Sequence, residues 1–156
     1  MRNSFFFLVL SCLFLTGTST AQADQINSNE VTFVVEMTIN DKSPAQIEQF
    51  SEFYQKLVKK NEPETLGWLF YSTDPGKVTV IERYASPEAA MQHVKNIMPG
   101  GIAEAEFGEF AEHFIIEKIN VYGSVTEEWK KVATDLALNF DINPLISGYS
   151  REENKQ

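Results

Sequence analysis

One stretch of this sequence restricts the fold more than any other. Residues 31–39 alternate with a period of two, and one face is entirely apolar: Val31, Phe33, Val35, Met37 and Ile39. The opposite face carries Thr32, Val34, Glu36 and Thr38. This period is typical of a β-strand with one buried face. The chain therefore contains a sheet whose apolar side must be covered by another layer.

The covering layer is predicted by two Ser-Pro pairs, Ser43-Pro44 and Ser86-Pro87. Serine is a preferred N-cap, and proline is favoured in the first helical turn. The first helix has an apolar stripe at helical spacing and ends at 61–63; the stripe is Ile47, Phe50, Tyr54, Leu57 and Val58. The second helix is predicted to end at residues 99–101, Pro-Gly-Gly.

Three further strands complete the predicted order. Residues 66–73 and 77–85 form a hairpin across Asp74-Pro75-Gly76, and residues 114–122 form the last strand after a short acidic helix or loop at 104–112. The order strand-helix-strand-strand-helix-strand predicts an α+β fold of the ferredoxin-like type. Its sheet is antiparallel, with helices on one face.

The predicted domain spans residues 24–122, and residues 123–156 form an extension that packs on it. Residues 124–127, Ser-Val-Thr-Glu, are a candidate capping box. The extension's helix is predicted from Trp129, Val132, Ala133, Leu136 and Phe140, and a short extended segment is expected at 145–150, after Pro144.

Residues 1–23 have the features of a secretory signal peptide. Arg2 precedes an apolar run, and Ala21-Gln22-Ala23 is a small-x-small cleavage pattern. An uncleaved anchor and a lipoprotein modified at Cys12 are the alternatives. Cleavage predicts a periplasmic or secreted protein without cysteine, hence without disulfides or a thiol nucleophile. A formal net charge of −9 argues against nucleic acid and anionic membranes as partners.

The uncovered face of the sheet indicates an assembly. In residues 78–84, Val78 and Val80 alternate with Thr79 and Ile81, so neither face is plainly polar. Helices cover only one of these faces, and the other must meet solvent or a partner. Dimerisation through the sheets, with an internal cavity in each subunit, is the arrangement that we expect.

The region from Tyr54 to Val94 resembles the antibiotic biosynthesis monooxygenase (ABM) family of dimeric α/β barrels. The resemblance rests on residues 54–57 (Tyr-Gln-Lys-Leu), 61–68 (Asn-Glu-Pro-Glu-Thr-Leu-Gly-Trp), 80–84 (Val-Ile-Glu-Arg-Tyr), 86–90 (Ser-Pro-Glu-Ala-Ala) and His93. Family members commonly have a Glu-Pro-Gly-like turn, where this chain has Glu64-Thr65. The match spans residues 31–122.

The resemblance implies a homodimer with a pocket in each subunit. It also implies cofactor-independent oxidation of a small quinol or phenolic aromatic with dioxygen. Haem degradation, another activity in the family, usually needs an Asn early in the first strand, and residues 31–39 contain none.

Five residues are site candidates. His93 is the candidate base or anion stabiliser, because its ordinary pKa suits proton transfer near neutral pH. Arg83 would contact an anionic oxygen, Trp68 and Tyr84 would stack on a planar ligand, and Glu36 would face the cavity. Each has a structural alternative: a packed histidine, a salt bridge, core aromatics and a solvated carboxylate.

Two further groups receive no site role. Glu82 is expected to be a buried carboxylate tied to backbone or to arginine. Glu106, Glu109 and His113, with His93, have a spacing that can bind a metal, but the pattern is weak and we predict no metal site.

Three functions remain open from the sequence. The first is a monooxygenase of a phenolic or quinol substrate. The second is a non-catalytic ligand-binding or stress-related module with the same cavity. The third is a structural dimer whose pocket is filled by its own C-terminal extension.

Overall fold

The computed structural model describes residues 29–148. The elements follow in the order β1 (Val31–Ile39), α1 (Pro44–Asn61), β2 (Thr65–Asp74), β3 (Lys77–Tyr84), α2 (Pro87–Ile97), α3 (Glu104–His113), β4 (Phe114–Tyr122), α4 (Glu127–Asp135) and β5 (Phe140–Asn143). The predicted leader, residues 1–23, lies outside the described residues. Within residues 29–148, no helix is both long and apolar enough to span a membrane.

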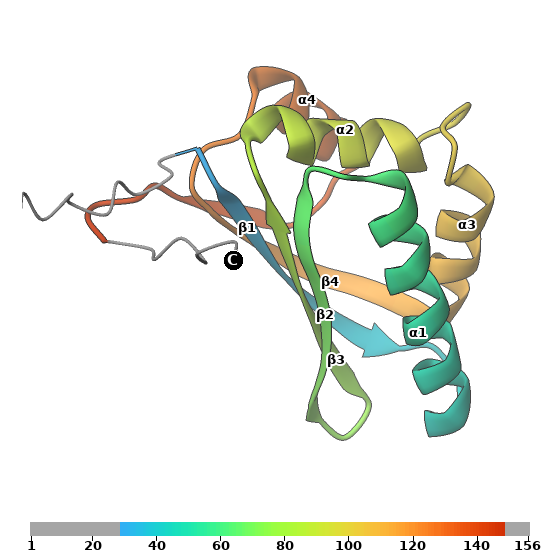
Figure 1. The fold of residues 1–156 in the computed structure, drawn as a ribbon. Helices are drawn as coiled ribbons and strands as arrows, with labels where there is room; N and C mark the ends of the chain where they lie inside the picture. The colour runs from blue at the N-terminus through green and yellow to red at the C-terminus, as the bar shows by residue number, and fades with distance from the viewer. Residues whose placement is uncertain (1–28, 149–156) are drawn as a thin grey trace, which may run out of the picture.

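The strands form one sheet in the order β2-β3-β1-β4-β5. Neighbouring strands are antiparallel except β4 and β5, which are parallel. The helices lie on one side of this sheet, and its other face is left open (Figure 1). The predicted α+β, ferredoxin-like fold is therefore confirmed, with β5 added at the edge of β4.

Local signals in the sequence account for the central elements. The alternating side chains of β1 put Val31, Phe33, Val35 and Met37 against the helices, each no more than 4% exposed. Ser43 and Gln46 form a reciprocal capping box at the start of α1. The Ser86 hydroxyl accepts from the Ala89 amide at 3.1 Å at the start of α2.

A β-bulge in β4 sets which of its side chains face inward. Glu36 pairs with Lys118, yet the next residue, Met37, pairs with Ile116, so Glu117 is the additional residue. Its carboxylate accepts a hydrogen bond from Lys77 at 2.6 Å. The bulge lets both Ile116 and Ile119 face the helices although three positions separate them.

The C-terminal extension differs from its prediction in two places. Thr126, not Ser124, caps α4, because its hydroxyl accepts from the Trp129 amide at 3.0 Å. The helix ends at Asp135, and Ala137 follows with a φ of 51°, in the left-handed region. Phe140 therefore belongs to β5 and not to the helix.

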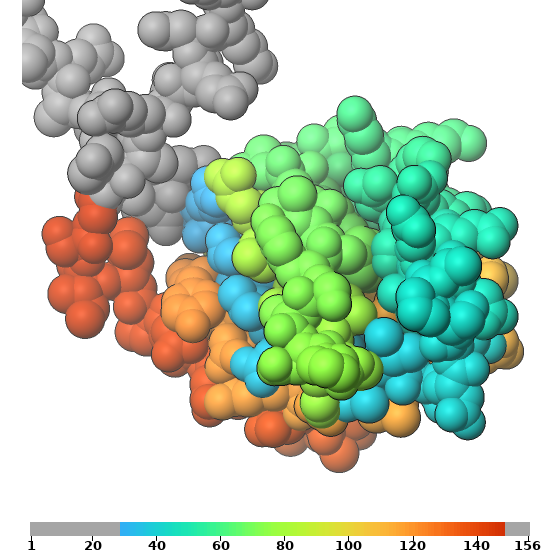
Figure 2. All heavy atoms as spheres, turned by 90° about the horizontal axis from the view of Figure 1, so that it is seen from below, coloured from blue at the N-terminus to red at the C-terminus, as the bar shows by residue number. Residues whose placement is uncertain are grey.

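The short strand consequently precedes Pro144, where the prediction put it after that proline. Residues 145–148 have no regular structure, and the remaining positions 149–150 lie outside the described residues. The strand position is fixed by tertiary contacts: β5 pairs with β4, and Phe140 lies edge-on against Trp129 with ring centroids 5.2 Å apart. In Figure 2, the C-terminal segment and α1 lie at opposite sides of the molecule.

Candidate functional site

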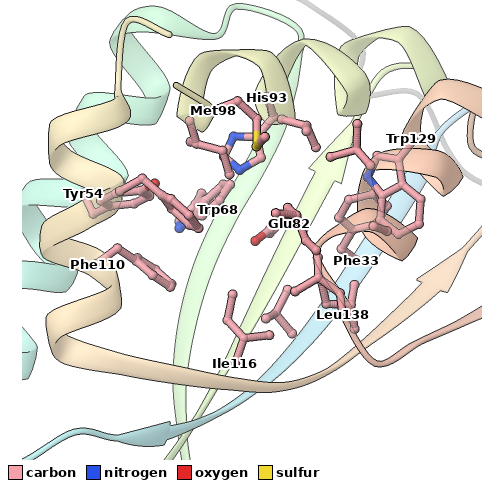
Figure 3. A pocket seen from close by; sticks show the side chains of 18 residues that line it. Phe33, Tyr54, Trp68, Glu82, His93, Met98, Phe110, Ile116, Trp129 and Leu138 are labelled. Atoms are coloured by element: carbon pink, nitrogen blue, oxygen red, sulfur yellow. The ribbon is translucent and has the colours of Figure 1, made fainter. Parts of the chain in front are cut away.

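A cavity of about 280 Å³ lies between the inner face of the sheet and the helices (Figure 3). Most of its lining is apolar or aromatic, and the walls include Phe33, Tyr54, Trp68, Phe107, Phe110, Ile116 and Ile119. The C-terminal extension supplies a further wall, made by Trp129, Val132, Ala133, Leu136 and Leu138. Within residues 123–148, the extension therefore lines one side of the cavity without filling it.

His93 reaches this cavity from α2 and is held by a carboxylate from the end of α1. Its Nδ1 lies 2.9 Å from Oε1 and 3.1 Å from Oε2 of Glu62. Both side chains are buried, at 6% and 8% exposure. Glu62 also accepts hydrogen bonds from Asn96 Nδ2 at 3.1 Å and from Thr65 Oγ1 at 2.9 Å. Such a set of donors favours an ionised carboxylate.

Burial and hydrogen bonding act against each other on both partners. Burial disfavours the charged form of Glu62, but hydrogen bonds from His93, Asn96 and Thr65 outweigh it and hold the pKa of Glu62 below its usual value. Burial likewise disfavours the imidazolium, but the bond to Glu62 and its charge raise the pKa of His93 above its usual value.

The carboxylate also selects the tautomer of His93. Because Glu62 can only accept when ionised, Nδ1 carries the proton and donates it, which leaves the lone pair on Nε2 in the neutral ring. Nε2 meets no hydrogen-bond partner within residues 29–148. The ring is packed between Trp68 and Tyr84, with centroids 5.0 and 5.8 Å away. The geometry is that of a fixed, carboxylate-supported base at the cavity wall.

Glu82 is a second carboxylate in the same cavity, on the inner face of β3. It is 7% exposed, and its Oε2 accepts a hydrogen bond of 2.6 Å from the Tyr84 hydroxyl. Burial raises the pKa of Glu82, and the charge of His93 and the bond from Tyr84 offset this only in part. The expectation that Glu82 is tied to backbone or to arginine is wrong: its partner is a tyrosine.

The structure brings two of the predicted site residues to the cavity wall and a third directly behind it. His93 and Trp68 line the cavity. Tyr84 is fully buried and contacts the ring of His93 and the carboxyl of Glu82. Tyr84 therefore supports the wall, and the aromatic side chains that line the cavity near it are Trp68, Tyr54 of α1 and Phe107 and Phe110 of α3.

Arg83 and Glu36 lie on the opposite face of the sheet, so their predicted places in the cavity are wrong. The Arg83 Nε is 2.7 Å from Oε1 of Glu30, and Glu36 accepts from Asn120 Nδ2 at 2.8 Å. The reason is strand alternation: the residue next to the inward-facing Glu82 must point outward. The structure instead shows the predicted alternatives: Arg83 forms a salt bridge, and Glu36 is an exposed carboxylate.

The weak metal-binding pattern has a structural explanation. His113 Nδ1 donates to the backbone oxygen of Glu109 at 2.9 Å, and its ring stacks on Phe50 with centroids 4.0 Å apart. Within residues 29–148 no group of three or more histidine or acidic side chains could hold a metal ion.

Sequence reasoning missed the partner of His93. Glu62 lies in the family-like stretch 61–68, but its sequence context predicts no role for it, because 31 residues separate it from His93. A carboxylate placed just where a helix ends, before a proline, was the available signal. The wall formed by the extension was also missed, because an amphipathic helix does not show what it packs against.

Several solved structures resemble this one. MupZ from Pseudomonas fluorescens is 20% identical, with a TM-score of 0.61, over 79% of this chain and 95% of that protein. A cofactor-independent oxygenase from Streptomyces nogalater, SnoaB, is 15% identical over 63% of this chain and 95% of its own, with a TM-score of 0.49. A candidate antibiotic biosynthesis monooxygenase from Deinococcus radiodurans is 15% identical, with a TM-score of 0.45 over 62% of this chain and 93% of that one.

These similarities concern the fold. Proteins described as candidate ABM monooxygenases are among the structural neighbours. No protein-family model and no curated protein matches the sequence.

Proposed function

We propose that this protein is a cofactor-independent monooxygenase of a small phenolic or quinol substrate. One observation carries the proposal: the imidazole of His93 is fixed through Nδ1 by the buried Glu62 and presents Nε2 at the wall of an apolar cavity. A base in this setting is oriented before substrate binds, which is the arrangement that general base catalysis needs.

The proposed chemistry begins with transfer of a phenolic proton to Nε2 of His93. The resulting anion is electron-rich and reacts with dioxygen. For 1,4-naphthohydroquinone the overall change is C10H8O2 + O2 → C10H6O3 + H2O, so the substrate supplies all the electrons and no separate reductant is required. Trp68, Tyr54 and Phe110 offer ring faces for a planar ligand.

Oxygen uptake tests the proposal directly. We expect saturable uptake of dioxygen by the purified protein with 1,4-naphthohydroquinone and simpler hydroquinones, above their autoxidation. The His93→Gln variant should lose it. His113→Gln is the matched control, because it removes the other histidine of the chain, which stacks on Phe50 outside this cavity. Uptake that persists in His93→Gln, or that is lost equally in both variants, contradicts the assigned base.

A non-catalytic ligand-binding module is the second candidate, and the composition of the cavity favours it. Apart from Glu82, His93 and Tyr54, the cavity lining within the described residues consists of aliphatic and aromatic side chains, and the indole N–H groups of Trp68 and Trp129 are the remaining hydrogen-bond donors among them. Such a pocket would bind an aromatic ligand by burial alone. Quenching of Trp68 and Trp129 fluorescence by 1,4-naphthoquinone, without any oxygen uptake from its quinol, would identify this function.

We propose further that the protein is an exported homodimer. Export rests on the features of residues 1–23. Dimerisation rests on the open face of the sheet, where Leu69, Tyr71 and Tyr122 are about half exposed, at 46%, 46% and 51%. Half-exposed apolar side chains on an uncovered sheet face are typical of a surface that a partner covers. The purely structural dimer is less favoured, because the described part of the extension, residues 123–148, lines the cavity without filling it.

A further inference from the structure

The two carboxylates of the cavity have opposite surroundings. Glu62 accepts hydrogen bonds from three side chains, one of them a basic residue. Glu82 accepts one, from the Tyr84 hydroxyl, and within residues 29–148 no lysine, arginine or histidine forms an ion pair with it. A buried carboxylate with so little compensation is more stable as the neutral acid.

The position of Glu82 relative to the base is equally specific. In β3 it pairs with Phe33 of β1 and with Trp68 of β2, so it lies in the middle of the sheet. His93 enters the same cavity from α2, and Figure 3 shows the Glu82 side chain projecting between His93 and Ile116. A ligand in the cavity would thus have the base on its helix side and the acid on its sheet side.

Hydrogen bonding leaves one oxygen of Glu82 for a ligand. Tyr84 donates to Oε2, and Oε1 has no partner among the described residues. A proton on Oε1 can therefore be donated into the cavity. A carboxylic acid kept neutral by an apolar site is suited to donate a hydrogen bond or a proton to a developing oxyanion.

The other titratable groups around Glu82 support this state. They are Tyr54 and Glu62 from α1 and its end, His93 from α2 and Tyr84 from β3. Burial raises the pKa of both tyrosines, so they stay neutral. The charge of His93 acts to lower the pKa of Glu82, so a proton taken up by His93 makes Glu82 a better acid.

We propose that Glu82 is a second catalytic residue: a protonated carboxylic acid that delivers its proton to the peroxide formed from substrate and dioxygen. This role rests on the proposed monooxygenase function. The quinol gives its proton to His93 Nε2, and the electron pair of the anion forms a carbon–oxygen bond to dioxygen. Glu82 protonates the terminal oxygen of this peroxide anion. The hydrogen on the same carbon then returns as a proton to the Glu82 carboxylate while the oxygen–oxygen bond breaks.

Transfer of the last proton, from His93, completes the reaction. The departing hydroxide takes the proton held by His93 and leaves as water, and the carbon becomes a carbonyl. The hydroxyquinone and one water contain all the atoms of quinol and dioxygen, and both residues return to their starting states. The ligand class that follows is a neutral quinol with a hydrogen on the carbon beside the hydroxyl-bearing carbon.

The test compares Glu82→Gln and Glu82→Asp with the unchanged protein, using 1,4-naphthohydroquinone and dioxygen. Gln retains the shape and an acceptor for Tyr84 but has no proton to transfer. We expect turnover to fall about 100-fold or more in Glu82→Gln and hydrogen peroxide release per dioxygen to increase. Quenching by 1,4-naphthoquinone should persist, which shows that the cavity still binds a ligand, and Glu82→Asp should retain part of the rate. A merely structural role would not redirect oxygen to peroxide.

The outcomes separate the two proposals. Full uptake without extra peroxide in Glu82→Gln, with uptake lost in His93→Gln, overturns the role of Glu82 and leaves the monooxygenase intact. Absence of uptake in every protein overturns the monooxygenase and the acid step with it. Infrared spectroscopy then tests the protonation state itself in the unchanged protein. The carbonyl stretch of a buried protonated carboxyl at pH 7 is expected, and its absence contradicts the neutral acid even if Glu82→Gln does not fold.

Discussion

Replacing Glu62 with Gln should weaken the fold and change the titration of His93 together. The carboxylate holds His93, Asn96 and Thr65, and Gln retains its shape and one acceptor oxygen. What is lost is the charge, and with it the charge-assisted bond to His93. Hydrogen bonds to charged groups contribute about 1.5–3 kcal/mol, and breaking a buried pair costs up to about 5 kcal/mol. Because Gln preserves some bonds, we expect the free energy of unfolding to fall by about 2–4 kcal/mol.

The loss should depend on pH in a defined window. The pKa of Glu62 is lowered by folding, so its contribution is present above its ordinary value of 4.5 and is lost as pH falls through the folded value. The pKa of His93 is raised, so its contribution is present below 6.5 and is lost as pH rises through the folded value. The difference between the two proteins should therefore be largest between about pH 4.5 and 6.5.

Urea unfolding at pH 5.5 and at pH 9, together with NMR titration of His93, measures both effects. The pKa of His93 should be lower in Glu62→Gln than in the unchanged protein, because burial then acts without the compensating anion. Glu64→Gln is the control: this neighbouring glutamate is exposed, so its substitution should change stability by no more than about 0.5 kcal/mol. A loss in Glu62→Gln that is the same at both pH values, or an unchanged His93 titration, would refute the assigned ion pair.

Three further predictions concern the wall, the rate and the assembly. Trp129→Ala removes a side chain that is 2% exposed and should cost about 3–5 kcal/mol in urea unfolding; a loss below 1 kcal/mol would show that the extension is not part of the core. The kcat/KM for 1,4-naphthohydroquinone should rise as pH rises through the raised pKa of His93, since the base must be neutral; a flat profile excludes this base. Leu69→Glu should convert the proposed dimer to a monomer in light scattering, whereas Ile102→Glu, at an exposed site outside the strands, should not.

The elements that the sequence predicted well are those specified by neighbouring residues. The alternation of residues 31–39 and the caps Ser43 and Ser86 act within a few positions, so they can be seen without the tertiary structure. Phe140 shows the limit of this reasoning. It continues the helical spacing of Leu136, and only its contact with Trp129 and the pairing with β4 make it part of a strand.

The candidate site was predicted only in part, for a related reason. Alternation shows that Glu82 and Arg83 lie on opposite faces, but Val80 and Ile81 are both apolar, so the pattern does not say which face is covered. The predicted position of Arg83 in the cavity is wrong for this reason. The pairing of Glu62 with His93 joins the C-terminal end of α1 to the middle of α2, and no periodicity within either helix predicts it.

The chemistry proposed for the cavity depends on the extension that lies outside the family-like region. Trp129 and Ala133 are each 2% exposed and, together with Leu138, form a wall of the cavity opposite α1. Excluding water from that side strengthens the bond between Glu62 and His93, because charges interact more strongly in a medium of low dielectric constant. The same exclusion of water keeps the Glu82 carboxyl unhydrated, and the neutral acid is therefore favoured over the carboxylate. Burial thus disfavours the charged form of both carboxylates, and the donors around each decide the result: three side chains hold Glu62 ionised, whereas a single tyrosine leaves Glu82 its proton.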